Sequence, residues 1–164
     1  MEHFLTVFQA ALAAIREPRL FATERGYQGA LIGELQKRLA EVALPGDPII
    51  EQEYQKTLPH HGFTIRPDLI IHIPFERSAT GRRSEGNFVA LEMKVNATAA
   101  EADEDFASLV LMKERLGYPL TIFLNIGAAQ SYAERCPKRI AAQTVCFAVQ
   151  LRQDVPVISL ERCA

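Results

Sequence analysis

Hydrophobic residues recur every three or four positions along several segments of the chain, which is the period of an amphipathic helix. In the first segment Phe4, Phe8 and Leu12 fall on one face, and Glu2 stands where a signal peptide would carry positive charge. We therefore expect a packed helix there and not a targeting segment. The same period predicts helices over residues 3–16, 27–42 and 99–116, with a shorter one within residues 128–140.

Other segments alternate between apolar and polar residues or are apolar almost throughout, which is typical of strands. Residues 69–73 are nearly all apolar, as in a central strand that is buried on both faces. We expect strands within residues 49–58, 63–73, 88–95, 120–126, 144–151 and 155–160. The resulting order, α-α-β-β-β-α-β-α-β-β, predicts one mixed α/β domain over residues 1–164, with helices packed on a sheet.

Composition changes this picture little. The chain is 48% hydrophobic and 23% charged, and its 18 basic and 20 acidic residues give a net charge of −2. This balance gives no general attraction to polyanions, so contact with a nucleic acid would need a local basic patch. The three cysteines, an odd number without paired spacing, favour reduced thiols. Because no segment is long enough to span a bilayer, we expect a cytoplasmic protein with no membrane partner.

Two predicted strands carry charge where a strand beside a core should be apolar. Asp68 opens one of them in "RPDLIIH", and Glu92 and Lys94 interrupt the other in "VALEMKVN". Residues two apart on a strand share a face, so Glu92 and Lys94 point the same way. If the two strands pair as a hairpin, Asp68 can meet Glu92 across the pair. The loop between them is long, so turn type does not fix the register.

Two carboxylates that converge at a partly dry site repel each other unless positive charge lies between them. Hard oxygen ligands suit Mg²⁺, for which Mn²⁺ can substitute, and the backbone carbonyl of Met93 can add a ligand. Lys94 beside this pair can hold a water in line and stabilise charge that develops on phosphorus. These parts point to metal-assisted hydrolysis of a phosphodiester.

The dipeptide Pro67-Asp68, followed by Glu92-Met93-Lys94, resembles the PD-(D/E)xK signature of the restriction-endonuclease-like nuclease superfamily. The resemblance implies that the aspartate and the glutamate bind metal and that the lysine is catalytic. It also implies an α-β-β-β-α-β core, which the expected elements supply over about residues 27–126. The helix over 3–16 and the C-terminal strands would then be additions to this core.

Many members of the superfamily add a glutamate on the helix before the first strand, and Glu34 matches that position, at the edge of the apolar stripe. Some members carry a glutamine and a tyrosine on the later helix. Here Asp105 and Tyr118 are suggestive, but Ser108 stands where the glutamine is expected. The resemblance therefore does not extend to a particular subfamily. Gln28, earlier on the same helix as Glu34, is explained by packing at the start of the helix.

The long loop between the two motif strands holds the best local basic patch, formed by Arg77, Arg82 and Arg83, which can contact a phosphate backbone. The habits of the superfamily favour DNA over RNA as the substrate. A homodimer is the simplest way to cut both strands of a duplex. Among the histidines, His72 lies in an apolar strand and suits a satisfied core residue better than a base.

Each candidate also has a purely structural interpretation. Asp68 can be a turn residue after proline, Glu92 and Lys94 can form an ion pair or face solvent, Glu34 can be a solvated surface charge, and the arginines can lie on a solvated loop. The alternative function is a catalytically silent domain of this fold that binds or scaffolds together with a partner protein. The intact set of Asp68, Glu92 and Lys94 favours the nuclease.

Overall fold

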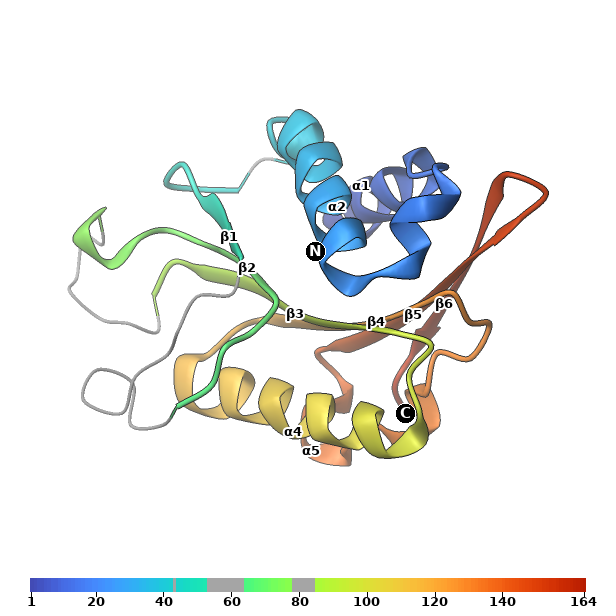
Figure 1. Cartoon of the computed structure of the whole chain (residues 1–164). Coiled ribbons are helices and arrows are strands. Elements are labelled where there is room, and N and C mark those ends of the chain that lie inside the picture. The colour runs from blue at the N-terminus through green and yellow to red at the C-terminus, as the bar shows by residue number, and fades with distance from the viewer. Residues whose placement is uncertain (43, 53–63, 78–84) are drawn as a thin grey trace.

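A computed structural model describes residues 1–42, 44–52, 64–77 and 85–164 of the chain. Its centre is a mixed sheet of six strands in the order β1-β2-β3-β4-β5-β6, with helices on both faces (Figure 1). The strands are β1 Ile49–Gln52, β2 Leu69–His72, β3 Asn87–Val95, β4 Leu120–Ile126, β5 Thr144–Arg152 and β6 Val155–Arg162. The helices are α1 Glu2–Ala14, α2 Glu24–Leu39, α4 Ala99–Leu116 and α5 Lys138–Ala141.

Strand direction divides the sheet into three parts. β2 runs antiparallel to its two neighbours, β1 and β3. The strands β3, β4 and β5 are parallel, and β6 returns antiparallel to β5. Parallel neighbours need a crossover connection, and α4 supplies it between β3 and β4, lying against both strands. The α/β class and the predicted order of helices and strands are confirmed.

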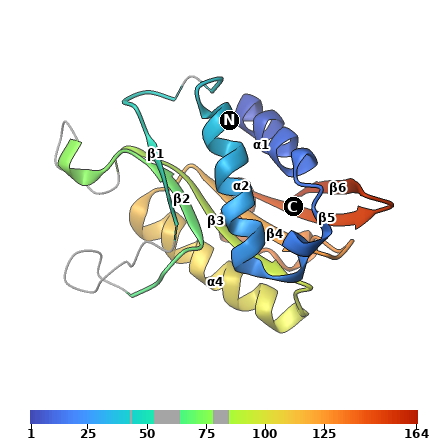
Figure 2. The ribbon, with the colours of Figure 1, turned by 45° about the horizontal axis from the view of Figure 1, so that its top comes forward.

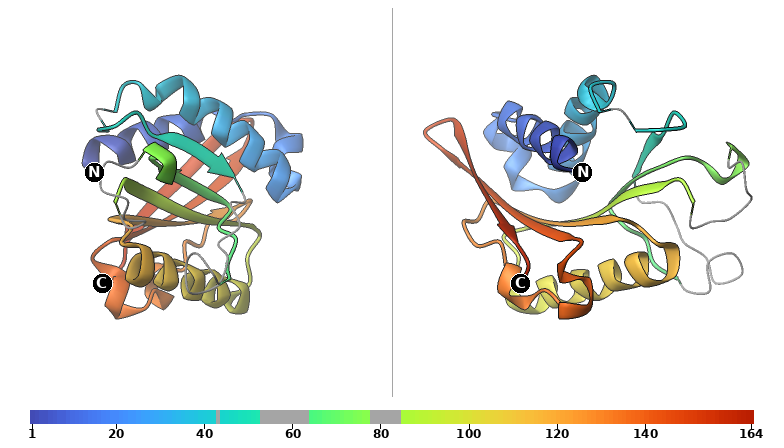
Figure 3. Two further views of the ribbon diagram at one scale, coloured as in Figure 1. Left: turned by 90° about the vertical axis from the view of Figure 1, so that its left-hand side faces the viewer. Right: turned by 180° about the vertical axis from the view of Figure 1, so that it is seen from behind.

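Two apolar clusters fill the space between the sheet and its helices. The cluster beneath α1 and α2 includes Phe8, Leu31 and Phe147, and the cluster beneath α4 and α5 includes Phe106 and Phe123. Figure 3 shows the resulting three layers from two further directions. No helix in the described part of the chain combines the length and apolar character needed to cross a membrane.

α2 begins three residues before the predicted start, and this difference matters for the site. Thr23 precedes the helix, and its Oγ1 accepts a hydrogen bond from the Gly26 N–H at 3.2 Å, as expected of an N-cap. The apolar stripe begins only at Tyr27, so periodicity placed the start too late. The first turn therefore adds Glu24 to a helix that lies across the sheet (Figure 2).

Two other segments also differ from the prediction. Within the segment expected at 63–73, the strand β2 occupies only Leu69–His72, because Pro67 has no N–H to give to the ladder. The helix expected within 128–140 is divided by Pro137 into a 3₁₀ turn, Ala133–Arg135, and the short helix α5. The remainder of the first predicted strand, residues 53–58, lies outside the described residues.

Candidate active site

The carboxyl groups of Asp68 and Glu92 meet at the end of the ladder between β2 and β3. The predicted antiparallel pairing is confirmed, and since Leu69 pairs with Leu91, Asp68 lies opposite Glu92. The Asp68 N–H donates to Glu92 Oε2 at 3.2 Å, and the Met93 N–H donates to Asp68 Oδ2 at 2.7 Å. Glu92 is only 5% exposed. The antiparallel register thus brings two carboxyl groups together in a place with little water.

This position makes both groups weak acids. Burial raises the pKa of Glu92 well above its ordinary value, and the negative charges of Asp68 and Asp105 raise it further. Burial also raises the pKa of Asp68, although the hydrogen bond from Met93 opposes the change. A hydrogen bond between the two carboxyl groups favours a proton on Glu92. The pair therefore holds a proton readily unless another positive charge takes its place.

Lys94 supplies a positive charge next to this pair. Its Nζ lies 3.4 Å from Oε2 of Glu24, which comes from the first turn of α2. Burial acts to lower the pKa of Lys94, but the charges of Asp105, Glu24 and Asp68 outweigh it, and the net effect is a raised pKa. Lys94 is therefore a stable ammonium ion and a hydrogen-bond donor, not a base at neutral pH.

Asp105 brings a further carboxyl group from α4. Side chains alternate along β3, and since Leu91 and Met93 pack beneath α1 and α2, Glu92 faces the α4 side of the sheet. Oδ2 of Asp105 is buried without a hydrogen-bond partner among the described residues. Burial raises the pKa of Asp105 to about 7, with Lys94 lowering it and the charge of Asp68 raising it.

Gln28 holds the backbone of this site from the other face. Its side chain is 4% exposed, and its Nε2 donates to the carbonyl oxygen of Asp68 at 2.6 Å. Packing at the start of the helix explains its burial but not this bond. Two features of the sequence could have pointed to Glu24 and Gln28 as site residues. Thr23 marks the start of the helix, and the spacing of four residues puts Glu24 and Gln28 on one helical face.

The donor set suits a hard cation. Asp68 and Glu92, with Glu24 and Asp105 beside them, offer only carboxylate oxygens, the ligands that Mg²⁺ prefers. The buried, unpartnered Oδ2 of Asp105 and the excess of acidic over basic side chains in the cluster favour a positive ion there. Within the described ranges, no three acidic, histidine or cysteine side chains already stand in a metal-binding arrangement. Binding an ion would therefore require these side chains to move.

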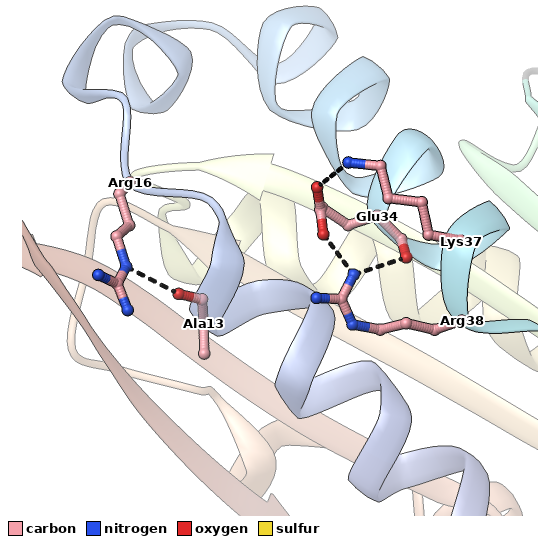
Figure 4. A network of polar contacts seen from close by, with 5 residues as sticks. All are labelled: Ala13, Arg16, Glu34, Lys37 and Arg38. Carbon is pink, nitrogen blue, oxygen red and sulfur yellow. Dashed lines mark hydrogen bonds and ion pairs between the residues drawn. The ribbon is translucent and has the colours of Figure 1, made fainter. Parts of the chain in front are cut away.

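Glu34 does not join the cluster. Its Oε1 lies 2.6 Å from the Nζ of Lys37, and its Oε2 contacts Nη1 of Arg38 (Figure 4). Hydrogen bonds from Lys37 and Arg38 lower the pKa of Glu34. Ten residues of helix separate it from Glu24, about 15 Å along the axis. The expectation that Glu34 faces the site is not met, and Glu24 is the glutamate of α2 that does.

Among the remaining candidates, Arg77 and His72 have partners other than the residues of this cluster. Nη1 of Arg77 is 3.6 Å from Oδ2 of Asp47, while Arg82 and Arg83 lie outside the described residues. Nε2 of His72 is 2.6 Å from Oε2 of Glu51, and the histidine is 8% exposed. The expectation that His72 is a satisfied core residue is confirmed. Phosphate binding by the arginines stays a prediction.

Comparison of the chain with protein-family models, with curated proteins and with solved structures gave no significant match.

Proposed function

We propose that the protein is a Mg²⁺-dependent nuclease that hydrolyses phosphodiester bonds, with DNA as a more suitable substrate than RNA. The observation that carries the proposal is the meeting of Asp68 and Glu92 at adjacent strand ends, with Lys94 on the same face of β3. Glu92 is buried, and both its burial and the charge of Asp68 raise its pKa, so its charged form is costly to the fold and a bound cation offsets that cost.

Asp68 and Glu92 are the proposed metal ligands, and Glu24 and Asp105 are near enough to contribute charge. A bound Mg²⁺ would supply a Lewis acid and lower the pKa of a coordinated water. Lys94, held as an ammonium ion among carboxylates, would donate hydrogen bonds to the attacking water and to a phosphate oxygen. Its charge would also stabilise the negative charge that develops on the phosphoryl group.

The order of elements supports the proposed kinship with restriction-endonuclease-like nucleases. α2, β1, β2, β3, α4 and β4 follow one another as α-β-β-β-α-β, which is the core that the resemblance implies. Glu92 and Lys94 lie on the third strand of this core, and Asp68 directly precedes the second. A motif that occurred by chance would have no reason to fall at facing positions of paired strands.

A homodimer would bring two sites to a duplex substrate, one for each strand. Arg77, Arg82 and Arg83 are the proposed phosphate contacts. The second candidate function is a catalytically silent module of the same fold that acts with a partner protein. The net charge of −2 and the need for side chains to move before an ion can bind favour this second candidate.

Cleavage assays separate the two candidates. Supercoiled plasmid, single-stranded DNA and RNA are incubated with the protein and Mg²⁺ or Mn²⁺, with EDTA as the metal-free control. Asp68→Ala removes a proposed ligand, and Glu34→Ala removes a carboxylate of the same chain that lies outside the cluster. Metal-dependent cutting by wild type and Glu34→Ala but not by Asp68→Ala supports the nuclease. Equal inertness of all three on every substrate favours the silent module.

A further inference from the structure

One face of α2 contacts two different residues of the proposed site. Glu24 and Gln28 are four residues apart, so they lie one turn apart on the same side of the helix. Glu24 reaches Nζ of Lys94 at 3.4 Å, and Nε2 of Gln28 reaches the carbonyl oxygen of Asp68 at 2.6 Å. The first two turns of α2 therefore contact both the ammonium group of Lys94 and the backbone of Asp68.

The Asp68 backbone needs such support because it lies where the strand ladder stops. β2 begins at Leu69, and the preceding Pro67 has no N–H to continue the ladder. Beyond the strand, Asp68 is held through its N–H by Glu92, through its carboxylate by the Met93 N–H, and through its carbonyl by Gln28. Only the last of these bonds comes from a different layer of the fold.

We propose that Gln28 is a positioning residue that fixes the Asp68 peptide and so sets the direction in which the Asp68 carboxylate presents its oxygens to a metal ion. This inference rests on the proposed function. Gln28 is buried and its amide donates a short bond, so its side chain has little freedom to follow a displaced backbone. Loss of the donor would let the strand end rotate while the rest of the sheet stays in place.

Gln28→Met tests this role, since methionine keeps the length of the side chain and removes the amide. The control is Thr121→Val, which removes a different side-chain hydrogen bond, the buried one between Oγ1 of Thr121 and Oγ1 of Thr144 at 2.7 Å. Thr121 pairs with Ala90 on β3, several residues from Lys94 along the strand. Both variants lose a buried polar contact, but only one of them is connected to Asp68.

Two readouts are compared in wild type and in both variants: the dissociation constant for Mn²⁺, from water-proton relaxation without substrate, and the kcat and KM for cleavage. In Gln28→Met we expect Mn²⁺ affinity and kcat to fall by about tenfold, as for residues that orient metal ligands, with KM nearly unchanged. Thr121→Val should match wild type in both. If Gln28→Met does not fold, Gln28→Asn, whose amide is one methylene too short, takes its place.

Four outcomes decide the matter. A loss confined to the Gln28 variant supports the positioning role. Wild-type values in that variant overturn the inference and leave the nuclease intact. Equal losses in the Gln28 and Thr121 variants show a general stability effect and also overturn it. If wild type neither binds Mn²⁺ nor cuts any substrate, the proposed function fails and the positioning role fails with it.

Discussion

Asp68 and Glu92 are fixed by the backbone of each other's strand segment. The Asp68 N–H donates to the Glu92 carboxylate, and the N–H of Met93, next to Glu92, donates to the Asp68 carboxylate. These bonds hold two acids in contact although their charges repel. The cost of that repulsion, and its relief by a cation, give the site properties that can be measured without knowledge of the substrate.

Neutralising Glu92 should stabilise the metal-free protein at alkaline pH. Burial raises the pKa of Glu92 in the folded state, so the folded protein binds more protons than the unfolded chain once the pH exceeds about 4.3. Stability therefore falls as pH rises through the raised pKa. In Glu92→Gln this fall should become smaller, with the remainder coming from Asp68 and Asp105, whose pKa values burial also raises, while cleavage drops by about a hundredfold or more.

The measurement is the free energy of unfolding in urea, with EDTA present, at a mildly acidic and a mildly alkaline pH. Glu34→Gln serves as the control because Glu34 lies outside the cluster and its pKa is lowered, not raised. An equal pH dependence in wild type and Glu92→Gln would show that the Glu92 carboxyl group is not destabilised by its surroundings.

Replacing Lys94 should affect rate and stability in separable ways. Lys94→Met removes a cation that lies among the carboxylates of the cluster, so we expect cleavage to fall about 10²–10³-fold and the metal-free protein to lose stability. Lys94→Arg keeps the charge but changes the shape and reach of the donor group. It should recover much of the stability and little of the rate. Recovery of full activity by arginine would argue against a specific role in holding water.

Glu24 and Glu34 offer a direct test of which glutamate of α2 serves the site. Glu24→Gln should lower cleavage by about tenfold, as expected when a group that orients a catalytic residue is lost. Glu34→Gln should leave the rate unchanged and shift the melting temperature by only about 1–2 °C, since ion pairs between neighbouring turns of a helix contribute little. Initial rates at saturating Mg²⁺ measure cleavage by the two variants, and thermal melts measure the shift in melting temperature. If Glu34→Gln lost more activity than Glu24→Gln, Glu34 would be the glutamate of α2 that serves the site.

Much of the fold follows from local pattern. α4 occupies the expected residues because a capping box of Thr98 and Glu101 starts it and Gly117, with φ 68°, ends it. β4 is buried throughout and mostly apolar, as a strand covered on both faces should be. Alternation along β3 was also sufficient to put Glu92 and Lys94 on one face, and antiparallel pairing to β2 then accounts for Asp68.

The rest of the site depends on contacts that cross layers, which periodicity does not encode. Glu24 lay before the apolar stripe of α2 and so outside the predicted helix, although its cap, Thr23, was visible in the sequence. Glu34 stood at the edge of that stripe, where a side chain can face either the sheet or the helix surface. Its ion pairs with Lys37 and Arg38 hold it at the helix surface. Gln28 is recognised as a partner of Asp68 only once α2 is docked on the sheet.

Mg²⁺ itself should stabilise the folded protein, and the effect should grow with pH. A ligand at a hundredfold excess over its dissociation constant adds about 2.7 kcal/mol, which for a chain of this size raises the melting temperature by roughly 5–10 °C. Protons compete with the ion for Asp68 and Glu92, whose pKa values are raised by burial, so the shift should be larger at mildly alkaline than at mildly acidic pH. Thermal melts with and without Mg²⁺ measure it. Glu34→Gln should respond as wild type does and Glu92→Gln should not, whereas a shift retained in Glu92→Gln would place the ion elsewhere.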